Sequence, residues 1–304
     1  MHQRKNPKLN TVADASVKNR RFALALVSPA FIYLIAVMGM PLLWAVYVSF
    51  TDKTIGSGYS FVGLHNYAEL LKDEVFIKSL YNTFVYAGVA VACKVFFGII
   101  MAVLLNQTLK FRGIFRVAMI LPWTITTTVS VFAWQWLYSD IGGALNQILK
   151  VLHLTSQPVG WLSTPKMAML SVIIVNVWRG TPFIGISVLA GLQNISYDLY
   201  EAAELDGAGV LRRFFSITLP LVKDVVLLST LVTTIWTLND FEIVWLMTRG
   251  GPSNGTQLIS TYSYTQGFLN MNISQSVAAA LILLPLLIVF VQMVSKISLK
   301  NEAN

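Results

Sequence analysis

The chain has 304 residues, of which 55% are hydrophobic and 12% are charged, and its mean hydropathy is +0.64. Soluble domains carry roughly 25% charged residues, so this composition predicts an integral membrane protein. The net charge of +8 does not indicate nucleic-acid binding, because no soluble basic domain carries it and cytoplasmic loops of membrane proteins are commonly basic. The single cysteine, Cys93, excludes an intrachain disulfide and a cysteine-rich metal cluster.

Six segments are long and apolar enough to cross a membrane, for which a helix needs about 20 residues. In chain order, the predicted spans are Phe22–Phe50, Leu80–Leu105, Phe115–Tyr138, Met167–Leu189, Leu221–Met247 and Ser276–Val294. The fold class predicted from them is all-α, an integral membrane six-helix bundle. Prolines within the spans mark expected kinks, and these are Pro29, Pro41, Pro122, Pro182 and Pro285.

The distribution of Lys and Arg predicts the orientation of the spans. Fourteen of these residues fall on one side, namely Arg4, Lys5, Lys8, Lys18, Arg20, Arg21, Lys110, Arg112, Arg116, Arg212, Arg213, Lys223, Lys296 and Lys300. The other side has six, namely Lys53, Lys72, Lys78, Lys150, Lys166 and Arg249. Because cytoplasmic loops are enriched in basic residues, both termini are expected inside the cell. The loops at 51–79, 139–166 and 248–275 are then expected outside.

Two polar segments stand out between the spans. The outer loop "SFVGLHNYAELLKDEVFIKSLYNT" has enough apolar residues to predict an amphipathic helix on the membrane rim. On the inner side, "EAAELDGAGVLRRFFSITLP" (Glu201 to Pro220) predicts one short helix that Ser196 caps and Gly207 ends, followed by a second over Val210–Ile217. Its small residues and carboxylates suit either a docking element or a plain solvated connector.

The sequence "EAAELDGAGVLRRFFSITLP" resembles the EAA loop of membrane subunits from binding-protein-dependent ABC importers. Every position of that pattern is filled at the family spacing, by Glu201, Ala202, Ala203, Gly207, Ile217, Leu219 and Pro220. The stretches "FVGLHNY", "AGLQNI" and "MTRGGPSNGT" are similar to the carbohydrate-uptake branch, the relatives of the maltose transporter permeases. The resemblance extends from about residue 22 to residue 296.

This resemblance implies that the loop forms a coupling helix, which inserts into a cleft on a separate cytoplasmic ATPase. From their positions in the motif, the residues expected to contact the ATPase are Glu201, Ala202, Ala203, Asp206 and Gly207. The chain itself shows no phosphate-binding loop of the GxxxxGK[ST] type, so ATP and magnesium are expected on the partner ATPase, with no cofactor in this chain. Its three histidines, His2, His65 and His153, have no spacing that suits a metal or a nucleophile.

Polar residues inside the spans are the candidates for a solute pathway, because burying them in lipid is costly. Arg179 could contact substrate hydroxyl groups or pair with an acid, whereas Lys94 is interpreted as structural or as facing a partner helix. Amides and carboxylates beside aromatic rings suit sugars, which need fixed hydrogen bonds and a flat apolar face. The candidate pathway residues are Asn176, Trp178, Arg179, Trp236, Asn239 and Asp240. The alternative for the fifth span is an aromatic belt at the outer interface.

We therefore predict the permease subunit of an ATP-driven importer for a sugar or oligosaccharide, in a bacterial or archaeal cytoplasmic membrane. Expected partners are an ABC ATPase dimer, a second related permease, an extracytoplasmic solute-binding protein and the lipid bilayer. Alternatives are a permease of the same class for a phosphorylated polyol or sugar acid, or an ATP-independent channel or secondary transporter. The predicted organisation is a tail over 1–21, a permease domain over 22–296 with its coupling loop near 193–221, and a tail over 297–304.

Overall fold

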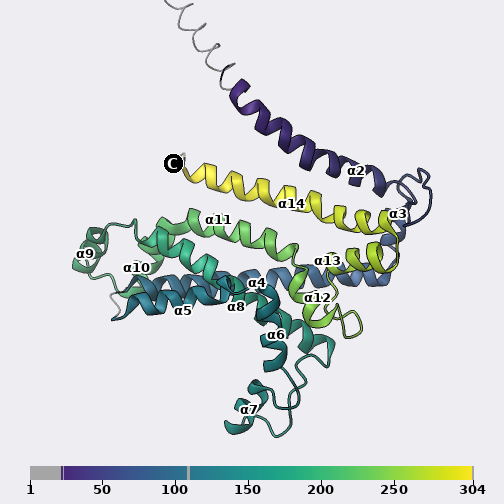
Figure 1. The fold of residues 1–304 in the computed structure, drawn as a ribbon. Coiled ribbons are helices and arrows are strands. Elements are labelled where there is room, and N and C mark those ends of the chain that lie inside the picture. Colours follow the sequence, from purple (N-terminus) through teal and green to yellow (C-terminus); the bar gives the residue numbers. More distant parts are fainter. Residues whose placement is uncertain (1–21, 23, 108–109, 303–304) are drawn as a thin grey trace, which may run out of the picture.

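The computed structural model describes residues 22, 24–107 and 110–302, and the predicted tail over 1–21 lies outside them. Within this described part, the chain is helical and has only two isolated β-bridges in place of strands. The long helices are α4 (Glu74–Asn106), α8 (Pro165–Leu192), α11 (Leu219–Leu238) and α14 (Ile273–Glu302). They run alongside one another in Figure 1, with α9 (Tyr197–Leu205) at one end and α3 (His65–Leu70) with α13 (Ile259–Tyr264) at the other.

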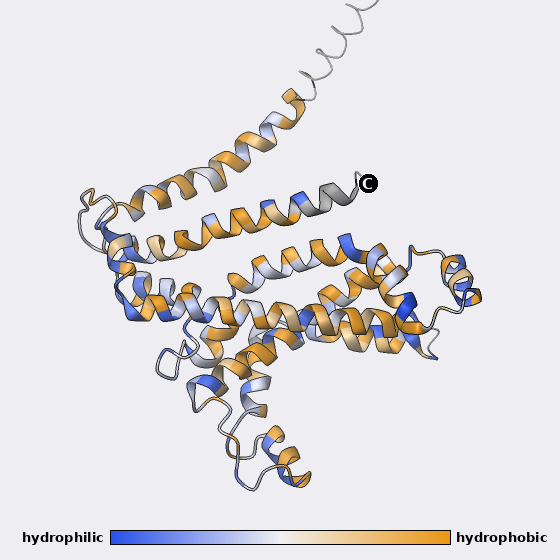
Figure 2. Cartoon of the chain, turned by 180° about the vertical axis from the view of Figure 1, so that it is seen from behind, coloured by the Kyte–Doolittle hydropathy of each residue, from blue (hydrophilic) through white to orange (hydrophobic). Residues whose placement is uncertain are grey.

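The apolar length of the helices agrees with most of the predicted spans. Among the described residues, five helices are long and apolar enough to cross a membrane: Leu24–Ser49, Glu74–Asn106, Pro165–Leu192, Val210–Leu238 and Ile273–Val294. Figure 2 shows hydrophobic residues along these helices and hydrophilic residues gathered toward their ends and loops. The first helix, Leu24–Ser49, stands apart from the bundle in Figure 1. Only 6% of an apolar 18-residue stretch within it is buried.

The third span was predicted over Phe115–Tyr138 with a kink at Pro122, and the structure breaks it more sharply, into two helices. The structure has α5 (Arg112–Thr124) and α6 (Thr127–Leu137), bent by 96° at a short break. Pro122 weakens the helix because it donates no backbone hydrogen bond, and the β-branched run that follows favours extended backbone. After α6 the chain reaches α7 (Ala144–Val151), which projects away from the long helices in Figure 1.

The fifth span was also predicted with wrong bounds. Its helix begins earlier, because α10 (Val210–Arg213), the π-helical turn η2 (Phe214–Thr218) and α11 form one continuous helix. The predicted separate helix at Val210–Ile217 is therefore the first part of the span. The span also ends at Leu238, and α12 (Glu242–Thr248) follows after a turn. Asn239 and Asp240 stop the helix because their side chains bind nearby backbone groups.

Two π-helical turns directly precede prolines. η1 (Ile35–Gly39) leads into α2 (Met40–Ser49), which contains Pro41 near its start, and η2 leads into α11 with Pro220 near its start. In each case the residue before the proline donates its N–H five residues back, to Ile35 or to Phe214. A π turn widens the helix locally, which accommodates a ring that would otherwise crowd the preceding carbonyl. Both helices thus continue through their prolines.

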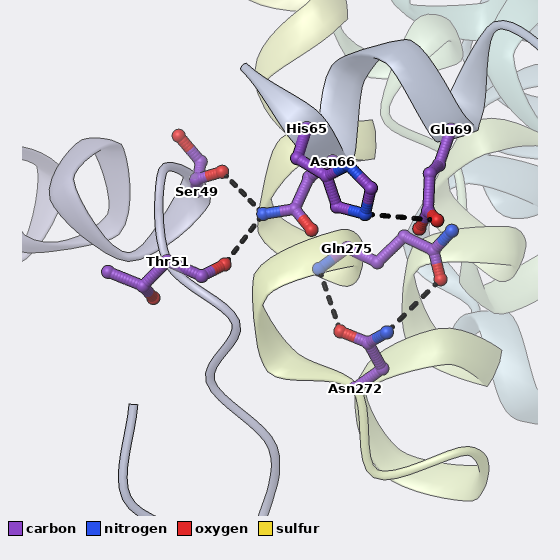
Figure 3. Close-up of polar contacts among 7 residues, drawn as sticks. All are labelled: Ser49, Thr51, His65, Asn66, Glu69, Asn272 and Gln275. Carbon is purple, nitrogen blue, oxygen red and sulfur yellow. Dashed lines mark hydrogen bonds and ion pairs between the residues drawn. The ribbon is translucent and has the colours of Figure 1, made fainter. Parts of the chain in front are cut away.

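Hydrogen bonds connect the end of the first helix to α3 and α14. The Asn66 side-chain amide donates to the carbonyl groups of Ser49 (2.8 Å) and Thr51 (2.7 Å), as Figure 3 shows. His65 and Glu69 pair on α3 at 3.1 Å, and Asn272 caps the start of α14 through the backbone N–H of Gln275. The predicted amphipathic helix of this loop is thus the short α3, because the Asp73 carboxylate begins α4 soon afterwards.

Small residues let α4 and α8 pack closely, which positions the polar residues between them. A Cβ added at Gly98 would lie 2.7 Å from Ile184, and one added at Gly185 would overlap Met101. Close approach at small residues is a common way for membrane helices to associate. A third helix, α11, packs against both, so polar side chains from α4, α8 and α11 meet inside the bundle.

Candidate functional site

A polar cavity of about 390 Å³ lies among α4, α8, α11 and the break between α5 and α6. Five of the six predicted pathway residues line it, namely Asn176, Arg179, Trp236, Asn239 and Asp240. The walls also include Lys94, Trp123, Thr127, Phe183, Thr233, Thr237 and Glu242. The structure therefore brings together most of the intramembrane polar residues that the sequence singled out.

Asp240 is the centre of the hydrogen-bond network in this cavity. Its carboxylate accepts from the Asn176 amide at 2.8 Å and from the Tyr86 hydroxyl. The other carboxylate oxygen accepts from the backbone N–H of Ile243 at 3.4 Å, at the start of α12. The Asp240 carbonyl accepts from the Ser260 hydroxyl. One residue thus joins α4, α8, α12 and α13, so Asp240 has a structural role as well as a place on the cavity wall.

Lys94 also lines this cavity. The sequence interpretation did not include it among the pathway residues. Its side chain is 4% exposed, and its ammonium group donates to the Thr237 hydroxyl at 3.0 Å. It lies over Gly180, where an added Cβ would be 2.6 Å from the Lys94 side chain. The sequence signal that could have placed Lys94 in the cavity is its position in the middle of a long apolar helix, because a charge there usually faces a polar interior.

Arg179 contacts the break in the third span. Its guanidinium donates to the Ile125 carbonyl at 3.2 Å, a group that the bend leaves without a helical partner. Among the described residues Arg179 forms no ion pair, and the alternative of an acidic partner stays a prediction. Three buried polar atoms of cavity-lining residues have no hydrogen-bond partner within the described part of the chain, namely Arg179 Nε, Asn176 Oδ1 and Thr233 Oγ1. Such groups are normally satisfied by water or ligand.

Aromatic rings also line the cavity. Phe183 and Trp236 lie 4.9 Å apart between ring centroids, and Trp123 lies 6.2 Å from Phe183. Trp236 remains 52% exposed, and the Asn239 side chain beside it is exposed as well. Aromatic rings together with amides and charges suit a sugar, because the sugar ring packs on aromatics while its hydroxyl groups bind polar atoms.

Trp178, the sixth predicted pathway residue, does not line this cavity. It borders a separate apolar hollow of about 510 Å³ and packs edge-on against Trp134 at 5.6 Å. The reason is helical geometry, because residues two positions apart point about 200° from each other around a helix. Asn176, Arg179 and Phe183 share one face of α8, whereas Trp178 lies on another.

The formal charges around the cavity balance. Lys94 and Arg179 are basic, and Asp240 and Glu242 are acidic. Glu242 accepts from the Thr128 hydroxyl at 3.1 Å and is exposed. A cavity of this kind offers hydrogen-bond donors and acceptors without a net field of one sign, which suits a neutral polar solute.

The EAA sequence forms a short helix at the far end of the bundle from α3. Ser196 caps α9 by accepting from the Asp198 N–H, and Asp206 ends it. Gly207 follows with φ of +77°, while its N–H and that of Ala208 bond back to Glu204 and Ala203 at 3.0 and 2.8 Å. These two bonds define a Schellman motif, in which glycine is favoured because other residues are strained at positive φ.

The two faces of α9 differ. On one face, the Tyr200 hydroxyl lies 3.0 Å from that of Thr218, and Glu204 pairs with Arg213 at 2.7 Å. Ala203 lies on this side and is half-buried. On the other face, Glu201, Ala202 and Leu205 are exposed, Leu205 by 90%. Ile217, Leu219 and Pro220 lie in the first turns of the following span, where they shape its start rather than the exposed face.

A membrane-spanning helical bundle that encloses a polar cavity and presents an exposed helix at one end has the architecture of a transport protein. The family model for the inner membrane component of binding-protein-dependent transport systems matches residues 94–298. The chain is 34% identical to a trehalose/maltose transport system permease protein from Thermococcus litoralis, over 84% of this chain and 86% of that protein.

Solved structures show the same fold. The chain resembles a bacterial ABC transporter involved in the import of the acidic polysaccharide alginate, with a TM-score of 0.79 and 22% identity over 94% of this chain and 98% of that one. A structure of a bacterial alginate ABC transporter in complex with an alginate pentasaccharide-bound periplasmic protein matches with a TM-score of 0.78. The identity is 22%, over 93% of this chain and 96% of that one. The chain belongs to the binding-protein-dependent transport system inner membrane component family. It is a multi-pass membrane permease subunit of an ABC importer, and not an enzyme.

Proposed function

We propose that the chain forms part of the translocation path for a neutral sugar or oligosaccharide. The observation that carries this proposal is the cavity, which Asn176, Asn239 and Asp240 line together with the rings of Trp236 and Phe183. The relative from Thermococcus litoralis is named for trehalose and maltose, which supports the solute class.

The charge balance favours a neutral solute over the acidic alternatives. A phosphorylated polyol or a sugar acid would need an excess of positive charge where it rests. The cavity instead has as many carboxylates as basic groups, and Asp240 is held in place by Tyr86 and Asn176. A neutral sugar can use the polar groups that remain accessible in this lining, such as the Asn239 amide, as hydrogen-bond partners.

We assign α9 the role of coupling helix toward a cytoplasmic ATPase dimer. Its exposed face presents Glu201, Ala202 and Leu205, and small residues allow a partner surface to approach closely. Asp206 and Gly207 set the direction in which the chain leaves the helix. This places the α9 end of the bundle and both chain ends in the cytoplasm, in agreement with the basic residues near it. ATP and magnesium are then bound by the ATPase.

The remaining partners occupy the other surfaces. An extracytoplasmic binding protein delivers the solute at the end formed by α3 and α13. A second, related permease completes the path, since the largely exposed first helix leaves apolar surface for another subunit or lipid to cover. The cavity opens to alternate sides as ATP shifts the equilibrium between two states of the whole complex.

The proposal is tested by uptake of radiolabelled maltose and trehalose into proteoliposomes that contain the complete transporter, with binding protein outside and ATP inside. Asn239→Ala removes an exposed amide from the cavity and should raise the half-saturating sugar concentration about fivefold, as expected for one lost hydrogen bond. Asn106→Ala is the matched control, because it removes an exposed amide at the end of α4. Equal uptake by both variants, or no sugar uptake by the unaltered complex, would contradict the proposal.

A further inference from the structure

A second polar pocket, of about 500 Å³, lies at the end of the bundle opposite α9. It is bounded by the start of α4, the end of α12, the loop after α12, and α13 with the π-helical turn η3 (Thr265–Leu269). The basic-residue distribution predicts that these segments lie outside the cell. The pocket is separate from the inner cavity, and none of the residues proposed above for solute contact lines it.

The frame of this pocket is held in place by several contacts. Asp73 caps α4 through the N–H groups of Val75 and Phe76, and accepts from the Tyr262 hydroxyl. Burial, together with the Asp73 carboxylate, raises the pKa of Tyr262 well above its ordinary value, so this phenol stays a donor. The Asn82 amide also donates to the carbonyl groups of Asn254 (3.0 Å) and Gln257 (3.1 Å). A pocket built this way is formed before any ligand arrives.

The side chains that face the pocket are chemically free to bind. Arg249, Asn254 and Gln257 line it, and within the described part of the chain their side chains make no hydrogen bond or ion pair. Trp245 contributes an aromatic ring that is half-buried. The pocket has Asp73 and Arg249 as its charged groups, so it too is balanced. Amides, a guanidinium and an indole ring are again a set that suits a neutral saccharide.

The helix α12 joins this pocket to the inner cavity. Its start, with Phe241 and Glu242, lines the cavity, and its end, with Trp245 and Arg249, lines the outer pocket. The rings of Phe241 and Trp245 are stacked at 5.6 Å with an interplanar angle of 16°. The two sites are thus about one helical turn apart along the same aromatic surface.

We propose that the outer pocket is an entry subsite for saccharide, which holds a sugar unit on Trp245 and Arg249 before it reaches the inner cavity. This inference rests on the proposed function and adds a second binding step to it. The subsite raises the chance that a sugar released by the binding protein moves inward rather than back to solvent.

The test uses the complete transporter in proteoliposomes, with binding protein and with maltose and trehalose as probes. Arg249→Asn removes the guanidinium while keeping a residue that tolerates the positive φ of 51° found here. We expect the half-saturating concentration of sugar-loaded binding protein for uptake to rise by about fivefold to tenfold, and Trp245→Phe to have a smaller effect. Lys72→Asn is the matched control, because it removes an exposed outer cation that does not line the pocket.

A direct measurement covers the case in which these variants assemble poorly. Asn270→Cys, combined with Cys93→Ser, places a single thiol at the exposed rim of the pocket. Saturating free maltose or trehalose, without binding protein, should slow its reaction with an impermeant maleimide several-fold. The same sugars should leave the reaction of a thiol introduced by Ser57→Cys unchanged.

The outcomes separate this inference from the proposed function. If the unaltered complex takes up the sugars, yet neither sugar slows labelling and Arg249→Asn behaves like Lys72→Asn, the entry subsite is overturned and the sugar pathway stands. If Arg249→Asn weakens association of unloaded binding protein as much as that of the loaded form, the pocket serves protein docking instead, which also overturns the inference. If the unaltered complex takes up neither sugar, the proposed function fails and the inference fails with it.

Discussion

The Asn176 amide on α8 donates a 2.8 Å hydrogen bond to the Asp240 carboxylate at the turn between α11 and α12. These residues are 64 positions apart in the sequence, and both were singled out as pathway residues. The buried Asn176 Oδ1 has no hydrogen-bond partner among the residues that the structure describes. The carboxylate thus fixes the orientation of the amide at the cavity wall.

Replacing Asp240 should disturb both the structure and transport. Asp240→Asn removes the charge that Tyr86 and Asn176 donate to, and hydrogen bonds to charged groups contribute about 1.5–3 kcal/mol each. We expect a clear fall in the thermal unfolding temperature of the purified complex, together with weaker uptake. Glu242→Gln is the control, since this exposed carboxylate has one hydrogen bond and its loss should cost about 0.5 kcal/mol or less. Equal unfolding temperatures for the two variants would rule out the proposed role of Asp240.

The two glycines after α9 should differ in their tolerance of substitution. An added Cβ meets nothing within 4 Å at either Gly207 or Gly209, so space does not distinguish them. Gly207 has φ of +77°, whereas Gly209 has φ of −65°. Gly207→Ala should therefore cost about 1–2 kcal/mol locally and reduce co-purification of the ATPase, while Gly209→Ala should have no such effect. Similar ATPase recovery with both variants would show that the left-handed turn is dispensable for coupling.

The orientation of the spans can be tested by labelling in intact cells. In a Cys93→Ser background, Ser57→Cys should react with an impermeant thiol reagent from outside, because residue 57 is exposed near α3. Arg212→Cys, exposed beside α9, should react only after the membrane is permeabilised. The reverse labelling pattern would place α9 outside the cell and refute its assignment as the coupling helix.

Much of the fold was predictable because apolar length determines which helices can span a membrane. The predicted bounds of α8 came within a turn of helix, whereas α4 begins at Glu74, well before the predicted Leu80. The polar residues inside both helices pointed to the cavity. The errors arose where local backbone chemistry interrupts an apolar run. The break after Pro122 and the stop at Asn239 and Asp240 both lie in such runs, and hydropathy alone does not show them.

The candidate site was predictable in its residue types and less so in its geometry. Asn176 and Trp178 were both chosen from one span, and only the rotation of α8 shows that they face different hollows. Lys94 was interpreted as structural or as facing a partner helix, and it both donates to Thr237 on α11 and borders the cavity. The two alanines of the EAA motif also look equivalent in sequence. In the structure Ala203 faces the span and Ala202 faces away, because α9 is held through Tyr200 and Glu204.

That difference makes Ala202→Trp the sharpest test of the claim that the chain is an importer permease driven through α9. The measurement is ATP hydrolysis by the complete transporter in proteoliposomes, with and without sugar-loaded binding protein. Ala202→Trp enlarges the exposed face of α9 without disturbing its contacts to the span, so hydrolysis stimulated by the binding protein should be lost. Ala144→Trp, at the start of the distant α7, should keep it. Full stimulation in the Ala202→Trp transporter would contradict the account.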